Sequence, residues 1–380
     1  MGASTKGKTK KKDSSSGKKK KKEEGAAEGT SPRGMVQDAL EIQRTRVVCG
    51  PDVNLYTSSN IAHNQYGHVD SSFSLDAFKE SLKIKVLKYD GDDMEFEVSG
   101  ISCSIANALR RVMIAEVPTM AIEHVYIMNN TSIIQDEVLS HRLGMIPLRV
   151  DPRLFEWKAA SDPANEKNTI VLKLDVTCKR LPDGSMENDK VYTSQLQWLS
   201  AGSEIPNDTK TVFESDQSLL IDSVGPVHED ILIAKLRPGQ RIQLECHCIK
   251  GTGEDHAKWS PVATTWYKLY PEVVLLDSTP EKDVCDALCE ELAGLMYLDD
   301  AGALQVDDAT KHEKLLEKVR RMSGEDAYKD VIQLRKRKDK FIFIIESTGA
   351  WKPHEIFQEA VKRLESKCDK VLEGLATFES

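Results

Sequence analysis

Cysteine is the first residue type to consider for chemistry in this chain of 380 residues, because thiolates bind metals and act as nucleophiles. The eight cysteines are Cys49, Cys103, Cys178, Cys246, Cys248, Cys285, Cys289 and Cys368. Two close pairs exist, 246/248 with strand spacing and 285/289 with helix spacing, but neither has the two-residue loop spacing of a zinc ribbon. The sequence therefore predicts reduced, mostly buried thiols, no metal site and no cofactor.

The other residue types form no recognisable catalytic centre. The acidic pairs at 299–300 and 307–308 are typical of solvated loops, and no Cys/His couple or serine-centred turn has a catalytic spacing. Gly251 and Gly253 suggest a phosphate loop, but the third glycine of a dinucleotide-binding motif is missing and a strand is expected to follow. We therefore predict that the isolated chain is not an enzyme.

Two adjacent arginines are better candidates, because arginine pairs with carboxylates through two parallel hydrogen bonds. Arg110 and Arg111 lie in a predicted helix that Ser102 can cap and that ends before Pro118. The helix has an apolar stripe containing Ile105, Leu109, Val112 and Met113. Adjacent helical residues lie about 100° apart, so at least one arginine must point away from the stripe. Asn107, at the edge of the stripe, needs a hydrogen-bond partner if it is buried.

Two further segments combine titratable and partner-binding residue types. His141 and Arg142 precede Gly144, which is expected to end a helix over residues 134–142; capping of that helix's last carbonyls is the alternative function. His256 and Trp259 follow the glycine-rich turn and offer a polar group and an aromatic anchor for a protein partner. Packing of Trp259 within its own domain is the alternative there.

Regular elements must position these residues. Alternating apolar residues predict a hairpin over residues 82–98 that turns at 90–93, and a second hairpin-like pair over residues 231–249. A helix is expected over residues 280–298, and the apolar run 341–345 should lie near the middle of a sheet. A final helix opening at Pro353 has an apolar stripe of about five turns: Ile356, Phe357, Ala360, Val361, Leu364, Cys368, Val371, Leu372 and Leu375.

Charge is divided unevenly along the chain. In residues 1–34, eleven Lys and Arg residues against four acids give a net charge of +7. Because the whole chain has a net charge of −9, the remaining residues have a net charge of −16. We expect this tail to be disordered and to act as a nuclear import signal or a weak nucleic-acid tether, with a solvated tail as the alternative. An acidic body is a poor binder of a phosphate backbone. No apolar run approaches the roughly 20 residues that cross a bilayer, so no membrane contact is expected.

Three linked motifs resemble a known family. The segments 107–111 (NALRR), 115–119 (AEVPT) and 141–148 (HRLGMIPL), in this order, resemble the α-like subunits of multisubunit RNA polymerases. The segment 256–259 (HAKW), after its glycine-rich turn, is similar to a segment found in the eukaryotic and archaeal members of this family. The resemblance covers nearly the whole chain, from about Val47 to Phe378.

The resemblance implies an α+β fold in which residues 35–118 plus 272–380 form a discontinuous dimerisation domain, made of a sheet and two long helices. Residues 119–271 would form a β-rich inserted domain, and residues 1–34 the basic tail. It implies a dimer interface at Ile105, Leu109, Val112, Phe357, Val361, Leu364 and Val371. Other partner contacts are expected at Asn107, Arg110, Arg111, His141, Arg142, His256 and Trp259.

The resemblance also implies a task. Such subunits are non-catalytic scaffolds that dimerise with a smaller α-like subunit and carry the two large catalytic subunits, so DNA and RNA are contacted only through the complex. Without a zinc or iron–sulfur cysteine cluster, the chain most resembles the branch used by eukaryotic RNA polymerases I and III, which transcribe ribosomal, 5S and transfer RNA. That branch implies the nucleus and nucleolus. The alternatives are a subunit of another nuclear RNA polymerase and a free-standing nucleic-acid-binding protein that uses the basic tail.

Overall fold

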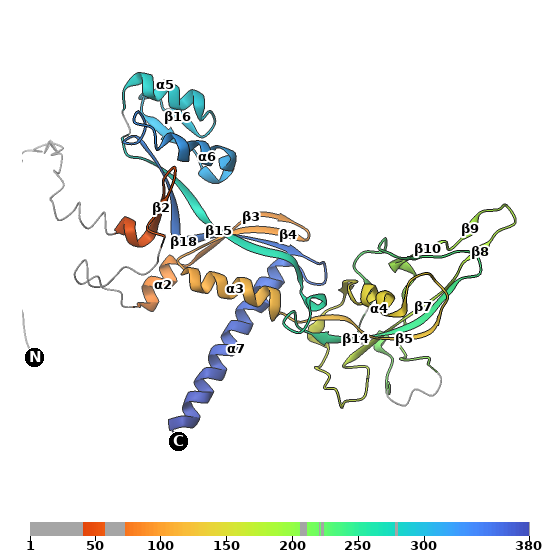
Figure 1. The fold of residues 1–380 in the computed structure, drawn as a ribbon. Helices are drawn as coiled ribbons and strands as arrows, with labels where there is room; N and C mark the ends of the chain where they lie inside the picture. The colour runs from red at the N-terminus through yellow and green to blue at the C-terminus, as the bar shows by residue number, and fades with distance from the viewer. Residues whose placement is uncertain are drawn as a thin grey trace, which may run out of the picture. The chain divides into compact units, whose positions relative to one another are not determined.

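The computed structural model describes residues 41–57, 73–205, 211–219, 221, 224–277 and 280–379. Residues 43–380 form one compact unit, and the predicted tail over residues 1–34 lies outside the described residues. The unit combines helices with antiparallel sheets, which confirms the predicted α+β class (Figure 1). Two sheets carry most of the fold, and each has its own hydrophobic core.

The first sheet is built around one long strand, β18 (Ile332–Ser347). Its other strands are β1 (Arg46–Cys49), β2 (Asn54–Leu55), β3 (Lys83–Asp90), β4 (Asp93–Ser99) and β15 (Val262–Leu275). Strand β15 runs along β18, whereas β1 and β4 pair with the first and second halves of β18. The apolar run 341–345 therefore lies between β4 and β15, as predicted for the middle of a sheet.

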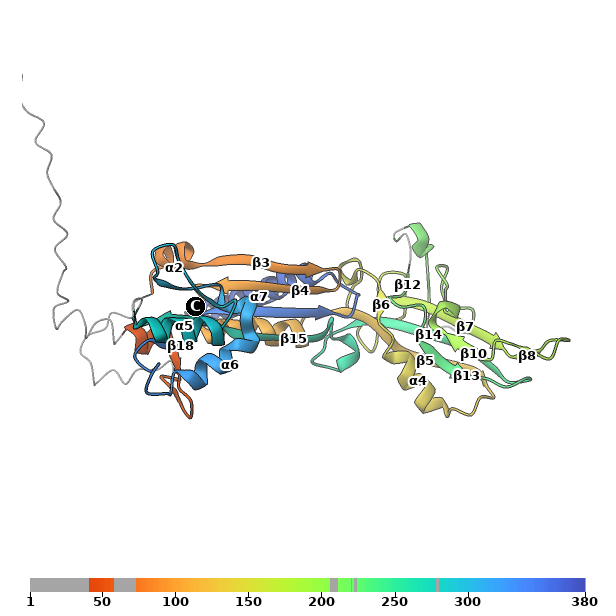
Figure 2. The ribbon, with the colours of Figure 1, turned by 90° about the horizontal axis from the view of Figure 1, so that it is seen from above.

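Two helices cover one face of this sheet. Ser102 accepts a hydrogen bond from the Ile105 amide and caps α3 (Cys103–Ala115), as the sequence predicts. Helix α7 (Pro353–Glu379) packs beside α3, and both lie behind the sheet in Figure 2. The rings of Phe96 and Phe343 stack at 5.4 Å in the core between sheet and helices. The hairpin of β3 and β4 turns at Gly91, whose φ of +59° favours glycine.

The second sheet has the strand order β11-β7-β14-β5. Its strands are β5 (Thr119–Asn130), β7 (Thr169–Thr177), β11 (Gln197–Trp198) and β14 (Arg241–Gly251), and α4 (Asp136–Gly144) packs on β5. The predicted hairpin over residues 231–249 is wrong. Strand β13 (Leu232–Lys235) pairs with β10 (Lys190–Tyr192), whereas β14 is buried on both faces and lies between β5 and β7.

The chain returns to the first sheet at Val262, where β15 starts, instead of at residue 272. The proposed division into a discontinuous domain and an inserted domain stays a prediction, with this change at its second boundary.

A small helical region links β15 to β18. It consists of α5 (Lys282–Glu291), β16 (Met296–Leu298), β17 (Leu304–Val306), η5 (Ala309–His312) and α6 (Glu313–Met322). The predicted helix over residues 280–298 is too long, because Gly294 has a φ of +91° and reverses the chain. No helix in the described ranges is long and apolar enough to span a membrane.

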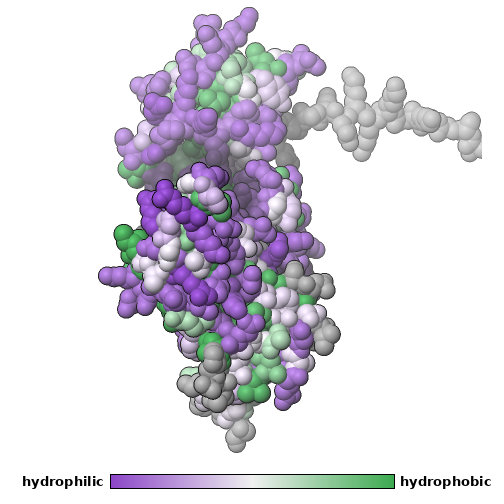
Figure 3. Space-filling model, turned by 90° about the vertical axis from the view of Figure 1, so that its right-hand side faces the viewer, coloured by the Kyte–Doolittle hydropathy of each residue, from purple (hydrophilic) through white to green (hydrophobic). Residues whose placement is uncertain are grey.

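The remaining elements are short. They are α2 (Leu75–Ser81), β6 (Leu148–Arg149), η1 (Pro152–Leu154), β8 (Lys179–Arg180), β9 (Met186–Glu187), η2 (Thr193–Gln195), η3 (Gln217–Leu219), β12 (Gly225–Pro226) and η4 (Ala257–Trp259). The face of the molecule seen in Figure 3 is mostly hydrophilic, with separate hydrophobic patches. The hydrophilic character of this face is expected for a chain in which 30% of the residues are charged.

Candidate partner interfaces

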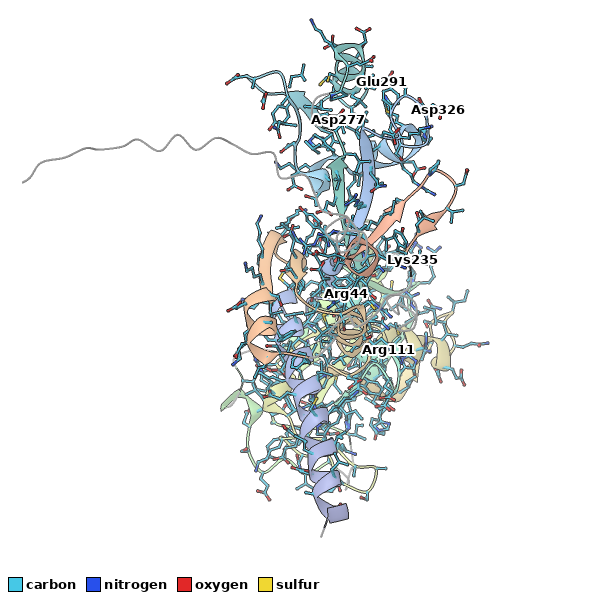
Figure 4. The ribbon with its side chains drawn as sticks, turned by 90° about the vertical axis from the view of Figure 1, so that its left-hand side faces the viewer. Arg44, Arg111, Lys235, Asp277, Glu291 and Asp326 are labelled. Carbon is cyan, nitrogen blue, oxygen red and sulfur yellow. The ribbon has the colours of Figure 1, made fainter. Side chains whose placement is uncertain are left out.

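The two arginines of α3 have different surroundings. Arg110 is half-buried, and its Nε and Nη2 donate to Oδ1 of Asn107 over 3.1 and 2.9 Å. Arg111 is exposed, and Figure 4 shows it apart from Glu291 and Asp326 of the helical region. Within the described ranges neither arginine forms an ion pair. Asn107 therefore orients Arg110, and both guanidinium groups keep donors for a partner's carboxylate.

A groove of about 780 Å³ lies beside Arg110. Its walls include Arg110 and Ile114 from α3, Thr264 from β15, and Met145 and Lys258 from the segments that follow α4 and β14. Its charged or titratable lining residues are Arg110, Lys258 and His228, and it contains no carboxylate among the described residues. This positive groove lies on a chain whose remainder after residue 34 is strongly acidic.

Lys258 contributes less to that charge than its position suggests. Its ammonium group pairs with Glu123, donates to the Ile122 carbonyl over 3.0 Å, and lies 4.4 Å from the centre of the Trp259 ring. A lysine held in this way has its charge compensated inside the chain. Arg110 therefore carries the uncompensated charge of the groove.

The glycines of the turn beside the groove allow close packing against neighbouring residues. A Cβ atom on Gly253 would lie 2.2 Å from the Ile114 carbonyl oxygen, and one on Gly251 would lie 2.3 Å from the Trp259 ring. Trp259 is buried and donates from Nε1 to the Ile249 carbonyl over 3.1 Å. Trp259 thus packs within its own chain, which is the alternative that the sequence left open.

His141 and His256 line a second pocket of about 420 Å³, which shares Met145 and Lys258 with the groove. Both histidines are exposed, and their ring centres lie 6.4 Å apart. The structure therefore brings His141, His256 and Arg110 together around the same two residues, although they come from three segments of the chain.

Arg142 has a structural role. Its Nε donates to the Ile233 carbonyl over 3.1 Å and its Nη2 to the Leu232 carbonyl over 2.7 Å. These bonds tie α4 to β13 and use two of the guanidinium's nitrogen atoms, while the residue itself stays exposed. Arg142 therefore bonds to β13 instead of capping its own helix, and its contact with a partner stays a prediction. Gly144 also differs from the expectation, because it is the last residue of α4 and has no left-handed φ.

The apolar stripe of α7 passes from the core to the surface. Ile356 and Ala360 are fully buried, Phe357 and Leu364 are half-buried, and Val361 is exposed. The C-terminal half of α7 extends away from the sheet in Figure 1 with no other drawn element beside it. There Val371, Leu372 and Leu375 are 62%, 63% and 56% exposed. The half-buried and exposed apolar positions follow a seam with alternating spacings of four and three: Phe357, Val361, Leu364, Cys368, Val371 and Leu375.

The corresponding stripe of α3 is mostly covered already. Leu109 and Val112 are 6% and 3% exposed and pack inside the chain, so they are not accessible to a partner. Ile105, at 37%, is the accessible member of the predicted set on α3. Sequence reasoning missed the contribution of β3, where Ile84, Val86 and Tyr89 are about half exposed although the alternation of Ile84 and Val86 is typical of a core strand. Only the position of β3 at the sheet edge accounts for their exposure.

The two thiols of β14 are fully buried in this fold. Burial raises the pKa of the Cys246 thiol far above its usual range, and burial does the same for Cys248. Both side chains belong to the core of the second sheet. They lie on one face of β14, as their spacing predicts.

Comparison with known proteins identifies the family of the chain. Residues 95–368 match the family described as the RNA polymerase Rpb3/Rpb11 dimerisation domain. The chain is 38% identical over 351 residues to the DNA-directed RNA polymerases I and III subunit rpac1 of Dictyostelium discoideum, covering 91% of this chain and 97% of that protein. It is 37% identical over 353 residues to the protein named RPAC1 in Mus musculus, covering 90% and 98%.

A relative from another polymerase is less similar. The chain is 31% identical over 296 residues to the DNA-directed RNA polymerase II subunit rpb3 of Dictyostelium discoideum, covering 75% of this chain and 92% of that protein. The matched region contains α3 and most of α7, the two helices whose apolar stripes the sequence singled out. The chain belongs to the RNA polymerase Rpb3/Rpb11 dimerisation domain family.

Proposed function

We propose that this chain is a non-catalytic assembly subunit of the nuclear RNA polymerases I and III. Two relatives named as subunits of DNA-directed RNA polymerases I and III are similar over nearly their whole length, and the polymerase II relative is less similar. This difference favours the branch shared by polymerases I and III. Nucleotide transfer would then belong to the assembled enzyme, with ribosomal, 5S and transfer RNA as its products.

The observation that carries the proposal is the uncovered seam of α7. A helix exposing valine and leucine at alternating spacings of four and three is stable in water when a second helix covers it. We assign the smaller α-like subunit to this surface, with Ile105 of α3 and the apolar residues of β3 at its margin. The description of the family as a dimerisation domain supports the assignment.

The large catalytic subunits are assigned to the surface around the groove. Arg110 and Arg111 offer free guanidinium donors, and His141 with His256 add exposed polar groups next to it. A partner carboxylate there would form charge-assisted hydrogen bonds, which fix orientation as well as adding affinity. The acidic remainder of the chain supports contact with DNA and RNA only through the complex.

The proposal includes a location. Subunits of nuclear polymerases work in the nucleus, and polymerase I activity would place a fraction of this chain in the nucleolus. The lysine runs at residues 10–12 and 18–22 suit nuclear import. Deleting residues 1–34 should shift the tagged chain toward the cytoplasm while leaving its purified fold unchanged.

Affinity purification with mass spectrometry tests the assignment. The tagged chain should recover one smaller α-like protein and the large subunits of polymerases I and III, without those specific to polymerase II. Arg111→Glu should reduce recovery of a large subunit about tenfold or more while keeping the smaller partner. Arg321→Glu, on an exposed arginine of α6, is the matched control and should leave recovery unchanged. Equal recovery with both variants would refute the role of Arg111.

A further inference from the structure

Strand β15 has a free edge next to the groove. It pairs with β18 on one side, and within the described ranges no other strand pairs with it. Register shifts occur between Val262 and Thr264 and between Leu269 and Pro271. Beyond Tyr267 the strand is approached by the helical region, where Glu313 pairs with Lys268 and Asp308 bonds Tyr270. The accessible edge therefore runs from Ala263 to Tyr267.

This edge offers main-chain hydrogen bonds. In an antiparallel ladder, alternate residues of an edge strand direct their N–H and C=O groups away from the paired neighbour. Ala263, Thr264 and Trp266 are exposed, so water reaches this part of the strand. Proteins usually cover, charge or bend such an edge to prevent unwanted pairing. Residues 263–267, the accessible part of the edge, contain no lysine, arginine or proline.

The two sides of the edge have different chemistry. On the face away from α3, Trp266 is 43% exposed and offers an aromatic contact. On the α3 side, Thr265 is buried, and the groove presents Arg110, which Asn107 holds in place. An extended segment laid along β15 would point successive side chains to these two sides in turn. One side would meet an aromatic ring and the other a cation.

We propose that an extended segment of another polymerase subunit adds to β15 as a strand, with acidic residues facing Arg110 and apolar residues facing Trp266. The occupant is acidic because Arg110 is uncompensated, Lys258 is already paired, and the described lining of the groove has no carboxylate. Main-chain bonds supply affinity in this mode of recognition, and alternate side chains supply specificity. The inference rests on the proposed function, since it names the way in which a polymerase subunit occupies the groove surface.

Hydrogen exchange of the complete chain is the first test. Peptides covering residues 262–269 are followed in the purified chain and in polymerase isolated through it. The exposed amides of the free edge should exchange about tenfold or more slowly in the polymerase. If the chain captured no polymerase subunit, the proposed function would fail and this inference with it. If it captured them while β15 exchanged at an unchanged rate, only strand addition would be overturned.

Crosslinking identifies the occupant. A photoreactive benzoylphenylalanine replaces Thr264 in the assembled polymerase, and a matched one replaces Tyr297, which is 52% exposed on β16. The label at position 264 should capture one extended segment in which acidic and apolar residues alternate, and the label at 297 should not capture it. Capture of a helix, of a segment without acidic residues, or of the same segment from both positions would overturn the proposal.

Discussion

Charging the exposed seam of α7 tests the dimer surface most directly. Val371→Asp places a carboxylate at a seam position that is 62% exposed in this chain. The free chain should keep its fold, because surface substitutions usually change the free energy of unfolding by less than about 0.5 kcal/mol. Valine and aspartate also have similar helix propensities. Association with the smaller α-like subunit should be strongly weakened.

The magnitude follows from the exposure of Val371. Fully burying an aliphatic side chain contributes roughly 1.5–3 kcal/mol, so covering the exposed 62% contributes about 1–2 kcal/mol. An unpaired polar group left in an apolar contact costs about 1–3 kcal/mol more. The total of about 2–5 kcal/mol corresponds to a Kd raised about 30-fold to about 5,000-fold.

The assay is a titration of the purified chain with the smaller α-like subunit, with the melting temperature of the free chain measured in parallel. Val53→Asp is the matched control, because Val53 is 65% exposed and lies next to β2, away from α7. The control should bind like the unmodified chain. Unchanged affinity of a folded Val371→Asp variant would refute the reasoning that the seam is a partner surface.

Three further predictions concern the fold and the groove. Gly253→Ala should lower the melting temperature, because the added Cβ would collide with the Ile114 carbonyl. Gly374→Ala adds its Cβ in open space on α7 and should raise the free energy of unfolding by about 0.5–1 kcal/mol. Calorimetry of the two variants measures both effects. Asn107→Ala should change the melting temperature little, because both residues of the pair are only part-buried, but should weaken capture of a large subunit in the purification assay. Full capture would contradict an orienting role. Burial alone would raise the pKa of Asp339, but bonds from Arg337 over 3.0 and 2.6 Å outweigh it and lower this pKa. The pair therefore stabilises the folded chain above the unfolded carboxyl pKa of about 3.9, and this contribution is lost as the pH falls through the lower folded value. Asp339→Asn should cost about 0.2–1 kcal/mol at pH 7 and converge with the unmodified chain in acid, as denaturant titration at both pH values would report; a difference that persists in acid would contradict the pairing.

Local patterns in the sequence determined the elements that carry the fold. Ser102 and the stripe after it predicted α3, the alternation around Gly91 predicted the hairpin, and the apolar run at 341–345 predicted a central strand. These predictions succeed because capping, turn geometry and side-chain periodicity act between residues close in sequence. Family membership was likewise predictable from motifs of a few residues each.

The tertiary structure decided which of those residues remain accessible. Trp259 looked available to a partner, yet it is buried and bonds the Ile249 carbonyl, whereas Arg142 stays exposed while it bonds two carbonyls of β13. Conversely, β3 has a core-like alternation but lies exposed at a sheet edge. Periodicity records which side chains share a face, whereas burial depends on what distant segments place against that face. The groove beside Arg110 arises for the same reason, because α3, β15 and the segments after α4 and β14 meet only in the folded chain.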